Sequence, residues 1–492
     1  MKPTDRRLCI VCRLQRIAFC LLLLLAIPAL VWAREPQHAP VPELPGKVEG
    51  GLTAEEVASR AEHTSPDLES KEREVDAAAA QVDAVLVGFF PRLQGDVSYT
   101  RLSYVAPSEL PLGVQAPGAP VGPLSAGTQL VKTQPAVIES LRNNTQLTVG
   151  LSYPVTDVLL RVSREHAAAS KSAQAARLNA GATRLKIRTD AKLTFYGWVR
   201  ARLQREVAER AVVQAEQHLD DVRVAFQADR VAKADVLRVE SQLADAELQR
   251  ARARNLVAYT ESQLRVVLHG SPAEVLEVGE DVHLALPVMP GFPPLTALAE
   301  EAADNRLEVQ SLLASASALR SQAAGARAPV VPSITLVASA SDSNPSSRVF
   351  AQTDRFTTSW QAGVRASWSP NDVVSALASG RSYEAKARSA DAQLKSLKDS
   401  LAIEVAQAVQ DVENADAAIG STARGLAAAE EGYRVRRLLF QAGRATSVEL
   451  TDAETELTRA RQAADDARVD QRVSRARLHH SLGRDVVSSQ LP

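Results

Sequence analysis

The chain has 492 residues, 23% of them charged, and a formal net charge of −1. A balance this close to neutral lacks the basic excess that nucleic-acid-binding proteins carry. All three cysteines (Cys9, Cys12 and Cys20) lie near the N-terminus, so the rest of the chain offers no disulfide, cysteine nucleophile or thiolate metal site.

Residues 1–33 have the pattern of a secretory signal peptide. A basic start precedes an apolar run over roughly residues 17–31, and Val31-Trp32-Ala33 offers a small-residue cleavage site. Cleavage would remove five basic residues and one acidic residue, which moves the net charge from −1 to −5. The alternative, a short membrane anchor, is disfavoured because Pro28 interrupts a run that is already short for a bilayer.

Two long stretches contain no proline, one between Pro154 and Pro272 and the other between Pro370 and Pro492. Both are rich in Ala, Arg, Glu, Gln and Leu, which favour helices. In each half of the chain the first and last helices have a summed length that matches the long one, so we expect the short helices to stack end to end beside the long one. The predicted helices cover about 54–88, 157–227, 234–268, 295–328, 372–441 and 448–482.

The two halves of the chain repeat one unit. Phe226-Gln227-Ala228-x-Arg230 recurs as Phe440-Gln441-Ala442-x-Arg444, at an offset of 214 residues, and Pro154 recurs as Pro370 at 216. Shared helical composition could produce scattered identities, but rare residues in register favour a true duplication. The predicted organisation is a signal peptide (1–33), an N-terminal linker (34–50), a first repeat (51–271), a Pro-rich linker (272–294), a second repeat (295–485) and a C-terminal tail (486–492).

Four stretches of about ten residues alternate between apolar and polar side chains, the length of a tilted membrane-spanning strand. They cover 93–99, 145–153, 333–340 and 360–368. Between the first two, the first repeat carries 25 more residues than the second, in a Pro- and Gly-rich stretch near 107–123 that predicts an irregular loop.

The apolar face of these strands has no obvious cover within the chain, because the flanking helices are too long to fold over it. Lipid would supply that cover, and Tyr99, Tyr153, Trp360 and Trp368 would suit the membrane interface. The alternative is an ordinary sandwich with one buried face.

Four strands cannot close a barrel, and open sheet edges are not tolerated in lipid. Two copies would give an 8-stranded barrel filled by its own side chains, whereas three would give 12 strands and an open lumen. We therefore predict an α+β membrane protein with an internal duplication. Three copies would form a 12-stranded β-barrel, four strands per chain, continuous with a long α-helical barrel.

Short motifs in the same order in both halves give a more specific resemblance. They are Ser65-Pro66-Asp67-Leu68, Phe90-Pro91-Arg92-Leu93, Leu151-Ser152-Tyr153-Pro154, Val331-Pro332-Ser333-Ile334 and the hairpin tip from Phe440 to Leu450. With this layout the chain resembles the TolC-type outer-membrane efflux protein family over nearly all of its length after residue 52. It departs from the family pattern at Arg306-Leu307-Glu308-Val309, where a proline is missing.

The resemblance implies a passive homotrimeric duct in the outer membrane, with its helices in the periplasm. There it would meet a periplasmic adaptor and an inner-membrane pump, as the exit duct of a tripartite efflux or type I secretion system. The exported substrate and the class of pump do not follow from this sequence.

The resemblance also places functional residues at the helix-hairpin tips. Phe440, Glu449 and Asp452 match positions that narrow the periplasmic mouth, and Asp235 is the counterpart in the first repeat. Glu449 and Asp235 have an alternative role as acidic caps in the first turn of a helix.

The turns themselves are the expected adaptor-docking tips, and the residues expected there are Phe226, Arg230, Gly443 and Arg444. Gly443 suits a left-handed turn, and Asp229 stands at the same place in the first repeat.

Two other classes of function fit the sequence less well. None of the eight histidines lies in an H-E-x-x-H pattern, and neither a nucleophile elbow nor a P-loop occurs, so we expect no enzyme, catalytic residue, cofactor or metal site. A soluble periplasmic coiled-coil adaptor or scaffold is the alternative, but such a protein has no need of paired ten-residue strands with an apolar face.

Overall fold

The computed structural model describes residues 50–484 apart from 107, 111–112, 116–122, 124–130, 133–134, 139–140, 272–273, 285 and 351–352. These residues belong to one unit that spans Lys47–Pro492. The predicted signal peptide, nearly all of the N-terminal linker and the predicted tail lie outside the described residues.

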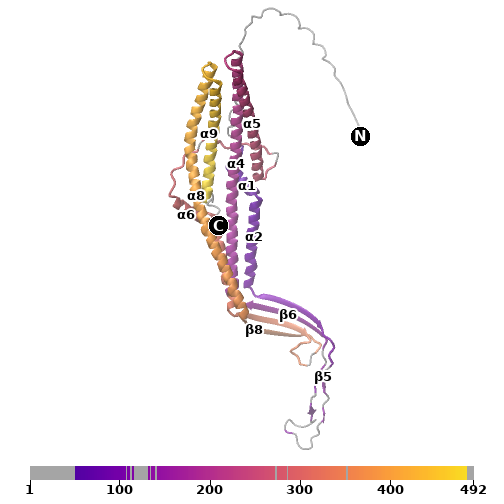
Figure 1. The fold of residues 1–492 in the computed structure, drawn as a ribbon. Helices are drawn as coiled ribbons and strands as arrows, with labels where there is room; N and C mark the ends of the chain where they lie inside the picture. Colours follow the sequence, from indigo (N-terminus) through magenta and orange to yellow (C-terminus); the bar gives the residue numbers. More distant parts are fainter. Residues whose placement is uncertain are drawn as a thin grey trace, which may run out of the picture. The chain divides into compact units, whose positions relative to one another are not determined.

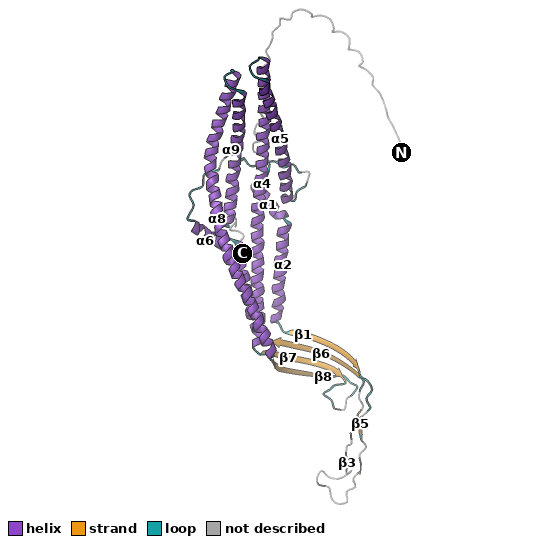
Figure 2. Ribbon diagram, in the orientation of Figure 1, coloured by secondary structure: helices purple, strands orange, loops and turns teal. Residues whose placement is uncertain are grey.

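Within this unit the long helices run side by side, and the strands lie at one end of them (Figures 1 and 2). Helices of the first repeat are α1 (Ala54–Thr64), α2 (Pro66–Leu86), the short α3 (Val155–Asp157), α4 (Ser163–Gln227) and α5 (Lys233–Leu268). Those of the second are α6 (Leu295–Asn305), α7 (Leu307–Ala326), α8 (Pro370–Gln441) and α9 (Ser447–Ser481). The short turns η1 (Val87–Phe89), η2 (Val158–Val162) and η3 (Ala328–Val330) lie where helices meet strands.

The prediction of unbroken helices over 54–88 and 295–328 was wrong, because each is interrupted once. Ser65 is extended, its side chain caps α2 by accepting from the Leu68 N–H at 3.4 Å, and Pro66 begins the new helix. In the second repeat Arg306 is also extended although no proline follows it.

Arg306 is held in place by tertiary contacts. Its guanidinium donates to Glu308 at 3.0 Å, to Glu404 on α8 at 3.1 Å and to the His480 carbonyl on α9 at 3.2 Å. Burial works against the charge, but the two carboxylates outweigh it, so the pKa of Arg306 is raised. The break in the second repeat therefore depends on partners about 100 residues or more away in the sequence.

The short helices stack end to end beside the long ones, as their lengths predicted. Where α1 meets α5, the Thr64 hydroxyl donates to the Leu268 carbonyl at 3.3 Å. Both helices pack on α4 around Phe195 and Trp198, which are fully buried against Val57 and Leu264. A second core joins α6, α8 and α9 in the same way; its buried members are Leu298, Ala302, Val405, Ala408, Val409, Val412, Leu478 and Leu482.

The Pro-rich linker between the repeats is held against α8 and α9 by polar contacts. Arg472, almost fully buried, donates to Glu280 at 2.9 Å and to the Leu284 carbonyl at 2.8 Å. The Gln471 side chain exchanges two hydrogen bonds with the backbone of Leu286, at 2.9 and 3.0 Å, and donates to Asp416 on α8 at 2.6 Å. The linker thus connects α8 and α9 of the second repeat through these side chains.

One antiparallel sheet of four strands has the order β1-β6-β7-β8. Its strands are β1 (Arg92–Arg101), β6 (Asn143–Pro154), β7 (Ser333–Asn344) and β8 (Thr357–Ser367). Each repeat contributes two of them, and β6 pairs with β7 across the repeats. The prediction of four strands per chain is confirmed.

Most of the expected irregular loop near 107–123 lies outside the described residues, and its described parts form short paired strands. Here β2 (Ser108–Leu110) pairs with β5 (Ala136–Ile138), and β3 (Val114–Gln115) pairs with β4 (Val131–Lys132). These pairs extend the β1–β6 connection as a hairpin, because both are antiparallel and nested (Figure 1). Among the described residues, no helix has both the length and the apolar character needed to cross a bilayer.

Candidate functional site

The sheet has one apolar face that is exposed to its surroundings. The register places Leu93 beside Leu151, Gly95 beside Val149 and Val97 beside Leu147. Alternation along each strand puts these residues on the same face, together with Leu336 and Val364 from β7 and β8. The side chains stay exposed, with 74% of Leu93, 77% of Val97 and 68% of Val364 accessible. A continuous apolar surface of this kind needs a cover of lipid or protein.

The opposite face of the sheet is polar. Gln94, Asp96 and Ser98 on β1 face the same side as Gln146 and Thr148 on β6. Strands β7 and β8 extend this face with Thr335, Ser339, Ser341, Ser343, Ser359, Gln361 and Arg365. This apolar-out, polar-in alternation is typical of strands in a membrane barrel with a wet lumen.

The four predicted interface aromatics share the apolar face but lie at different levels of it. Tyr153 and Trp368 lie at the end of the sheet near the helices, where the Trp368 indole donates to the Val330 carbonyl at 3.4 Å. Tyr99 lies at the other end, where its hydroxyl donates to Asn143 at 3.2 Å, and Trp360 lies between them. Three of them are strongly exposed: Tyr99, Trp360 and Trp368. Their contact with lipid headgroups stays a prediction.

At the far ends of the helices, the α4–α5 and α8–α9 hairpins close with the same turn. Gly443 has φ +71 and Asp229 has φ +56, so both adopt the expected left-handed conformation. The Arg444 N–H donates to the Leu439 carbonyl at 2.8 Å, and the Arg230 N–H donates to the Ala225 carbonyl at 2.9 Å. These are Schellman caps, which satisfy the last carbonyls of each long helix. Arg230 and Arg444 are both exposed at the turns.

Two of the three predicted gate acids cap helices. Glu449 accepts from the Thr446 N–H at 2.9 Å and pairs with Arg436 at 2.6 Å. These contacts, the Thr446 N–H first, lower the pKa of Glu449. Asp235 accepts from the Ala232 N–H at 3.2 Å at the equivalent place on α5. Asp452 is exposed, with no ion-pair partner among the described residues.

The fourth predicted gate residue, Phe440, does not lie on the surface of the chain. Only 7% of it is accessible, and it packs among Leu219, Val222, Val239 and Leu450 in the tip core. Its repeat-one counterpart Phe226, one of the predicted docking residues, is 41% exposed. Because Phe440 has almost no free surface, the structure assigns it to the tip core and does not support a constricting role.

A buried polar cluster next to Phe440 joins the two hairpins of the chain. His218 Nδ1 lies 3.0 Å from Glu454 Oε2, and its Nε2 lies 3.3 Å from Ser447 Oγ. Gln242 on α5 donates to Glu454 at 3.1 Å and accepts from Thr451 at 2.8 Å. The His218 ring also meets the edge of Phe440, with ring centroids 5.6 Å apart. We name these five polar residues, His218, Gln242, Ser447, Thr451 and Glu454, the tip lock.

Sequence reasoning missed the tip lock, because a single histidine on a long helix carries no local signature. The one signal available was the pairing of Glu240 with Glu454 at the 214-residue offset, which marks both as equivalent positions but says nothing of their partners. His218 and Glu454 are 236 residues apart in the chain.

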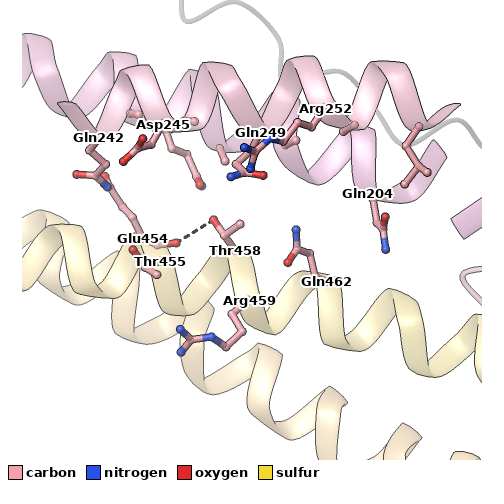
Figure 3. Close-up of a pocket in the computed structure, with 17 residues that line it drawn as sticks. Gln204, Gln242, Asp245, Gln249, Arg252, Glu454, Thr455, Thr458, Arg459 and Gln462 are labelled. Carbon is pink, nitrogen blue, oxygen red and sulfur yellow. Dashed lines mark hydrogen bonds between the residues drawn. The ribbon is translucent and has the colours of Figure 1, made fainter. Parts of the chain in front are cut away.

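Next to the tip lock, a cavity of about 630 Å³ opens between α4, α5 and α9. Gln242, Asp245 and Gln249 on α5 face Glu454, Thr455 and Thr458 on α9 across it (Figure 3). The cavity therefore separates α5 from α9 next to the tip lock, whereas α4 and α9 meet again beyond it, where Arg200 lies 3.5 Å from Asp466.

Comparison with known proteins agrees with this architecture. The model of the family described as outer membrane efflux protein matches residues 57–270 and 298–484. No curated protein matches the chain.

Several solved outer-membrane channels share the fold at low sequence identity. The CmeC outer membrane channel of Campylobacter jejuni is 14% identical, with a TM-score of 0.69 over 94% of this chain and 92% of its own. The outer membrane protein VceC of Vibrio cholerae is 17% identical, with a TM-score of 0.68 over 87% and 96%. The open-state MtrE outer membrane channel of Neisseria gonorrhoeae is 18% identical, with a TM-score of 0.68 over 87% and 88%.

The family match covers well over half of the chain and both repeats. It confirms the prediction of a passive outer-membrane efflux channel and not an enzyme. It does not favour the alternative of a soluble adaptor. The chain belongs to the outer membrane efflux protein family.

Proposed function

We propose that three copies of this chain form the exit duct of a tripartite export system, through which substrate passes from the periplasm to the outside. The observation that carries the proposal is the four-stranded sheet with one exposed apolar face and two outer strands. Among the described residues β1 pairs only with β6, and β8 pairs only with β7. Pairing β8 of one copy with β1 of the next would close the sheet on itself and remove both edges.

The polar face of the sheet fits the lumen of a trimeric barrel better than that of a dimeric one. Twelve strands enclose a lumen wide enough for water, whereas eight strands leave a barrel filled by side chains. The many Ser, Thr and Gln side chains of the polar face are too short and too polar to fill such an interior as a dry core. A wet lumen explains why this face is mainly polar, with Val337 as the apolar exception.

The exposed aromatics support the same placement. Tyr153 and Trp368 lie at the end of the sheet near the helices, Tyr99 lies at the other end, and Trp360 lies between them in the row of Ala340 and Val149. Aromatic residues at two levels are typical of the two interfaces of a membrane barrel. The helices then continue into the periplasm.

The hairpin tips are the proposed meeting place with a periplasmic adaptor, which in turn contacts an inner-membrane pump. Arg230 and Arg444 project from matching turns, so a ring of three copies presents six such turns in one plane. The left-handed Gly443 has open space at its missing Cβ, which allows a partner backbone to approach closely. A partner with acidic or carbonyl-rich loops fits this surface.

The charge at the periplasmic mouth is proposed to come from three acids, Glu449, Asp452 and Asp235. Three copies would repeat each acid around the axis, and a ring of carboxylates favours cations and repels anions. Glu449 and Asp235 serve as caps as well, each with one carboxylate oxygen accepting from a backbone N–H. The other oxygen of Glu449 pairs with Arg436 at 2.6 Å, so Asp452 and Asp235 contribute more of the unbalanced charge than Glu449 does.

The proposal is tested with purified, detergent-solubilised protein. Its mass is expected to be three times that of the chain without its signal peptide, and its reconstitution into planar lipid bilayers is expected to give ion-conducting events. Material that stays monomeric in mild detergent would contradict the proposal, as would a trimer that passes no ions. A chain found in the soluble periplasmic fraction would instead favour the adaptor.

A further inference from the structure

The two outer strands of the sheet carry opposite charges on the polar face. Asp96 lies on β1 and Arg365 on β8, and both side chains are exposed. Over the part of the chain that the structure describes, neither side chain has an ion-pair or hydrogen-bond partner. Within one chain the register places Asp96 in the same row as Ser359, which is six residues from Arg365 along β8. The two charges therefore lie too far apart to meet inside a chain.

Closing a barrel of tilted strands requires a stagger where neighbouring copies meet. Strands in barrels tilt by about 35–45°, so a row of paired residues followed once around twelve strands ends about 12–17 residues from its start. The rows run straight across the four strands of one chain, so the three boundaries share this shift equally. Each boundary takes about four or six residues, since an odd number would turn the apolar side chains of one copy to the opposite face.

The lengths of the two outer strands give the direction of the stagger. Gly363 shares the row of Arg92 within the chain, so without stagger it would lie opposite Arg92 of the next copy. A shift toward the helices would move its partner to residues 86–88, which precede β1, and would leave most of β8 unpaired. A shift the other way makes the partner Asp96 or Ser98 and pairs nearly all of β1 with β8.

The charges favour the longer of the two staggers. With the shorter one, Arg365 would lie diagonal to both Asp96 and Arg92 of the next copy, so an attraction would be set against a repulsion. With the longer one, Arg365 lies directly opposite Asp96 and away from Arg92. Directly opposite side chains on one face of an antiparallel pair have Cβ atoms about 4.5–5.5 Å apart, which is close enough for an ion pair.

We propose that Arg365 of each copy forms an ion pair with Asp96 of the next copy on the lumen side of the barrel, and that this pair sets the register between copies. The apolar face cannot set the register alone. A slip of one residue turns apolar side chains into the lumen, but a slip of two keeps every side chain on its face. An exposed ion pair adds little affinity, yet opposite charges favour the register that joins them. The inference rests on the proposed ring of three.

Exchanging the two charges tests the pair. Asp96→Arg places two arginines at each boundary and Arg365→Asp places two acids, so each variant alone is expected to lower the yield of detergent-resistant trimer about fivefold. The double variant restores an opposite pair and is expected to return to within about twofold of the wild type. Ser339→Arg, which adds an arginine to the same face on the inner strand β7, is the control and should keep the wild-type yield.

Cross-linking tests the register itself, because the sequence has no cysteine after Cys20. Asp96→Cys with Arg365→Cys places two thiols side by side across each boundary. Asp96→Cys with Ser359→Cys is the matched variant, whose thiols meet only in a ring without stagger. After treatment with a short bismaleimide, denaturing gels are expected to show two and three linked chains for the first variant and single chains for the second.

Three outcomes would overturn the inference while the wild type remains a conducting trimer. The first is single charge variants that assemble as well as the wild type, and the second is a double variant that assembles no better than the single ones. The third is copies that do not link through the cysteine at position 365, or that link through the one at 359. A wild type that is monomeric in mild detergent fails instead at the proposed function.

Discussion

At the scale of single residues, the duplication provides internal comparisons within one chain. Gly443 and Asp229 occupy the same left-handed position of two equivalent turns, yet only glycine adopts this conformation without steric cost. The turn of the first repeat is therefore strained relative to that of the second.

Exchanging these residues should move stability in opposite directions. Gly443→Asp is expected to destabilise its turn by about 1 kcal/mol, and Asp229→Gly to relieve a similar strain. Hydrogen exchange of the Arg444 and Arg230 amides, which close the two turns, measures the effect locally. Gly425→Ala, in the exposed interior of α8, is the control, because alanine favours a helix and its Cβ meets open space. Faster exchange in Asp229→Gly would contradict the argument.

Some residues could be assigned from the sequence and others could not, for a physical reason. The left-handed turns, the acidic caps and the exposed aromatics follow from local patterns, and the structure places the turns and caps as expected. The burial of Phe440 in the single chain has no local signal, because it depends on His218, Leu219 and Val222 of the other repeat as well as on nearby Leu450. The tip lock was missed because its residues are brought together only by tertiary packing.

At the scale of elements, some helix and strand boundaries follow from the local sequence and others depend on long-range contacts. The long helices and the four strands were predicted closely, because helix composition and two-residue alternation are properties of a segment alone. The interruption between α1 and α2 has a local signal, because Ser65-Pro66 is typical of a helix start. The prediction of one continuous helix did not use it. The break at Arg306 had no local signal, because Glu404 and the His480 carbonyl hold it.

Asp416 makes the attachment of the linker dependent on pH. Burial alone would raise its pKa, but hydrogen bonds from Gln471 and the Met289 N–H, with the Arg475 guanidinium, outweigh burial and lower it. The unfolded chain then takes up the proton at a higher pH than the folded chain. The stabilisation is complete above the ordinary carboxylate range and is lost as the pH falls through the lowered pKa.

Thermal unfolding of wild type and Asp416→Asn tests this dependence. Below about pH 4 the wild type is expected to lose stability more steeply than the variant, because the variant has no proton to take up. Asp399→Asn, an exposed position on the same helix, should follow the wild-type curve. Parallel curves for wild type and Asp416→Asn would show that the carboxylate does not carry the effect.

The sheet makes an equally sharp prediction through two neighbouring residues on opposite faces. Val149→Arg puts a charge on the apolar face and is expected to cost about 2–4 kcal/mol in a membrane. Thr148→Arg puts the same charge on the polar face and should be tolerated. The yield of detergent-resistant trimer compares the two. Equal yields would mean that lipid does not cover the apolar face.

At the scale of the whole molecule, the charge at the mouth becomes testable. Glu449→Gln with Asp452→Asn removes the acids, and glutamine keeps an acceptor for the Thr446 N–H. Block by cations is expected to weaken and single-channel cation conductance to change with it, because a negative ring concentrates cations at the mouth. Glu413→Gln with Asp399→Asn, at exposed positions of α8 away from the turn, is the control for net charge. If the conductance and the cation block of the variant match those of the wild type, the acids do not act at the mouth.

The two unpaired outer strands have a consequence for inheritance. The proposed barrel closes only if β8 of each copy pairs with β1 of the next. One copy that cannot pair, such as one with a proline in the middle of β8, would leave the whole barrel open. In a cell that makes sound and faulty chains in equal amounts and assembles them at random, only about one ring in eight contains three sound copies. A faulty allele would therefore act dominantly, although its product harms nothing by itself.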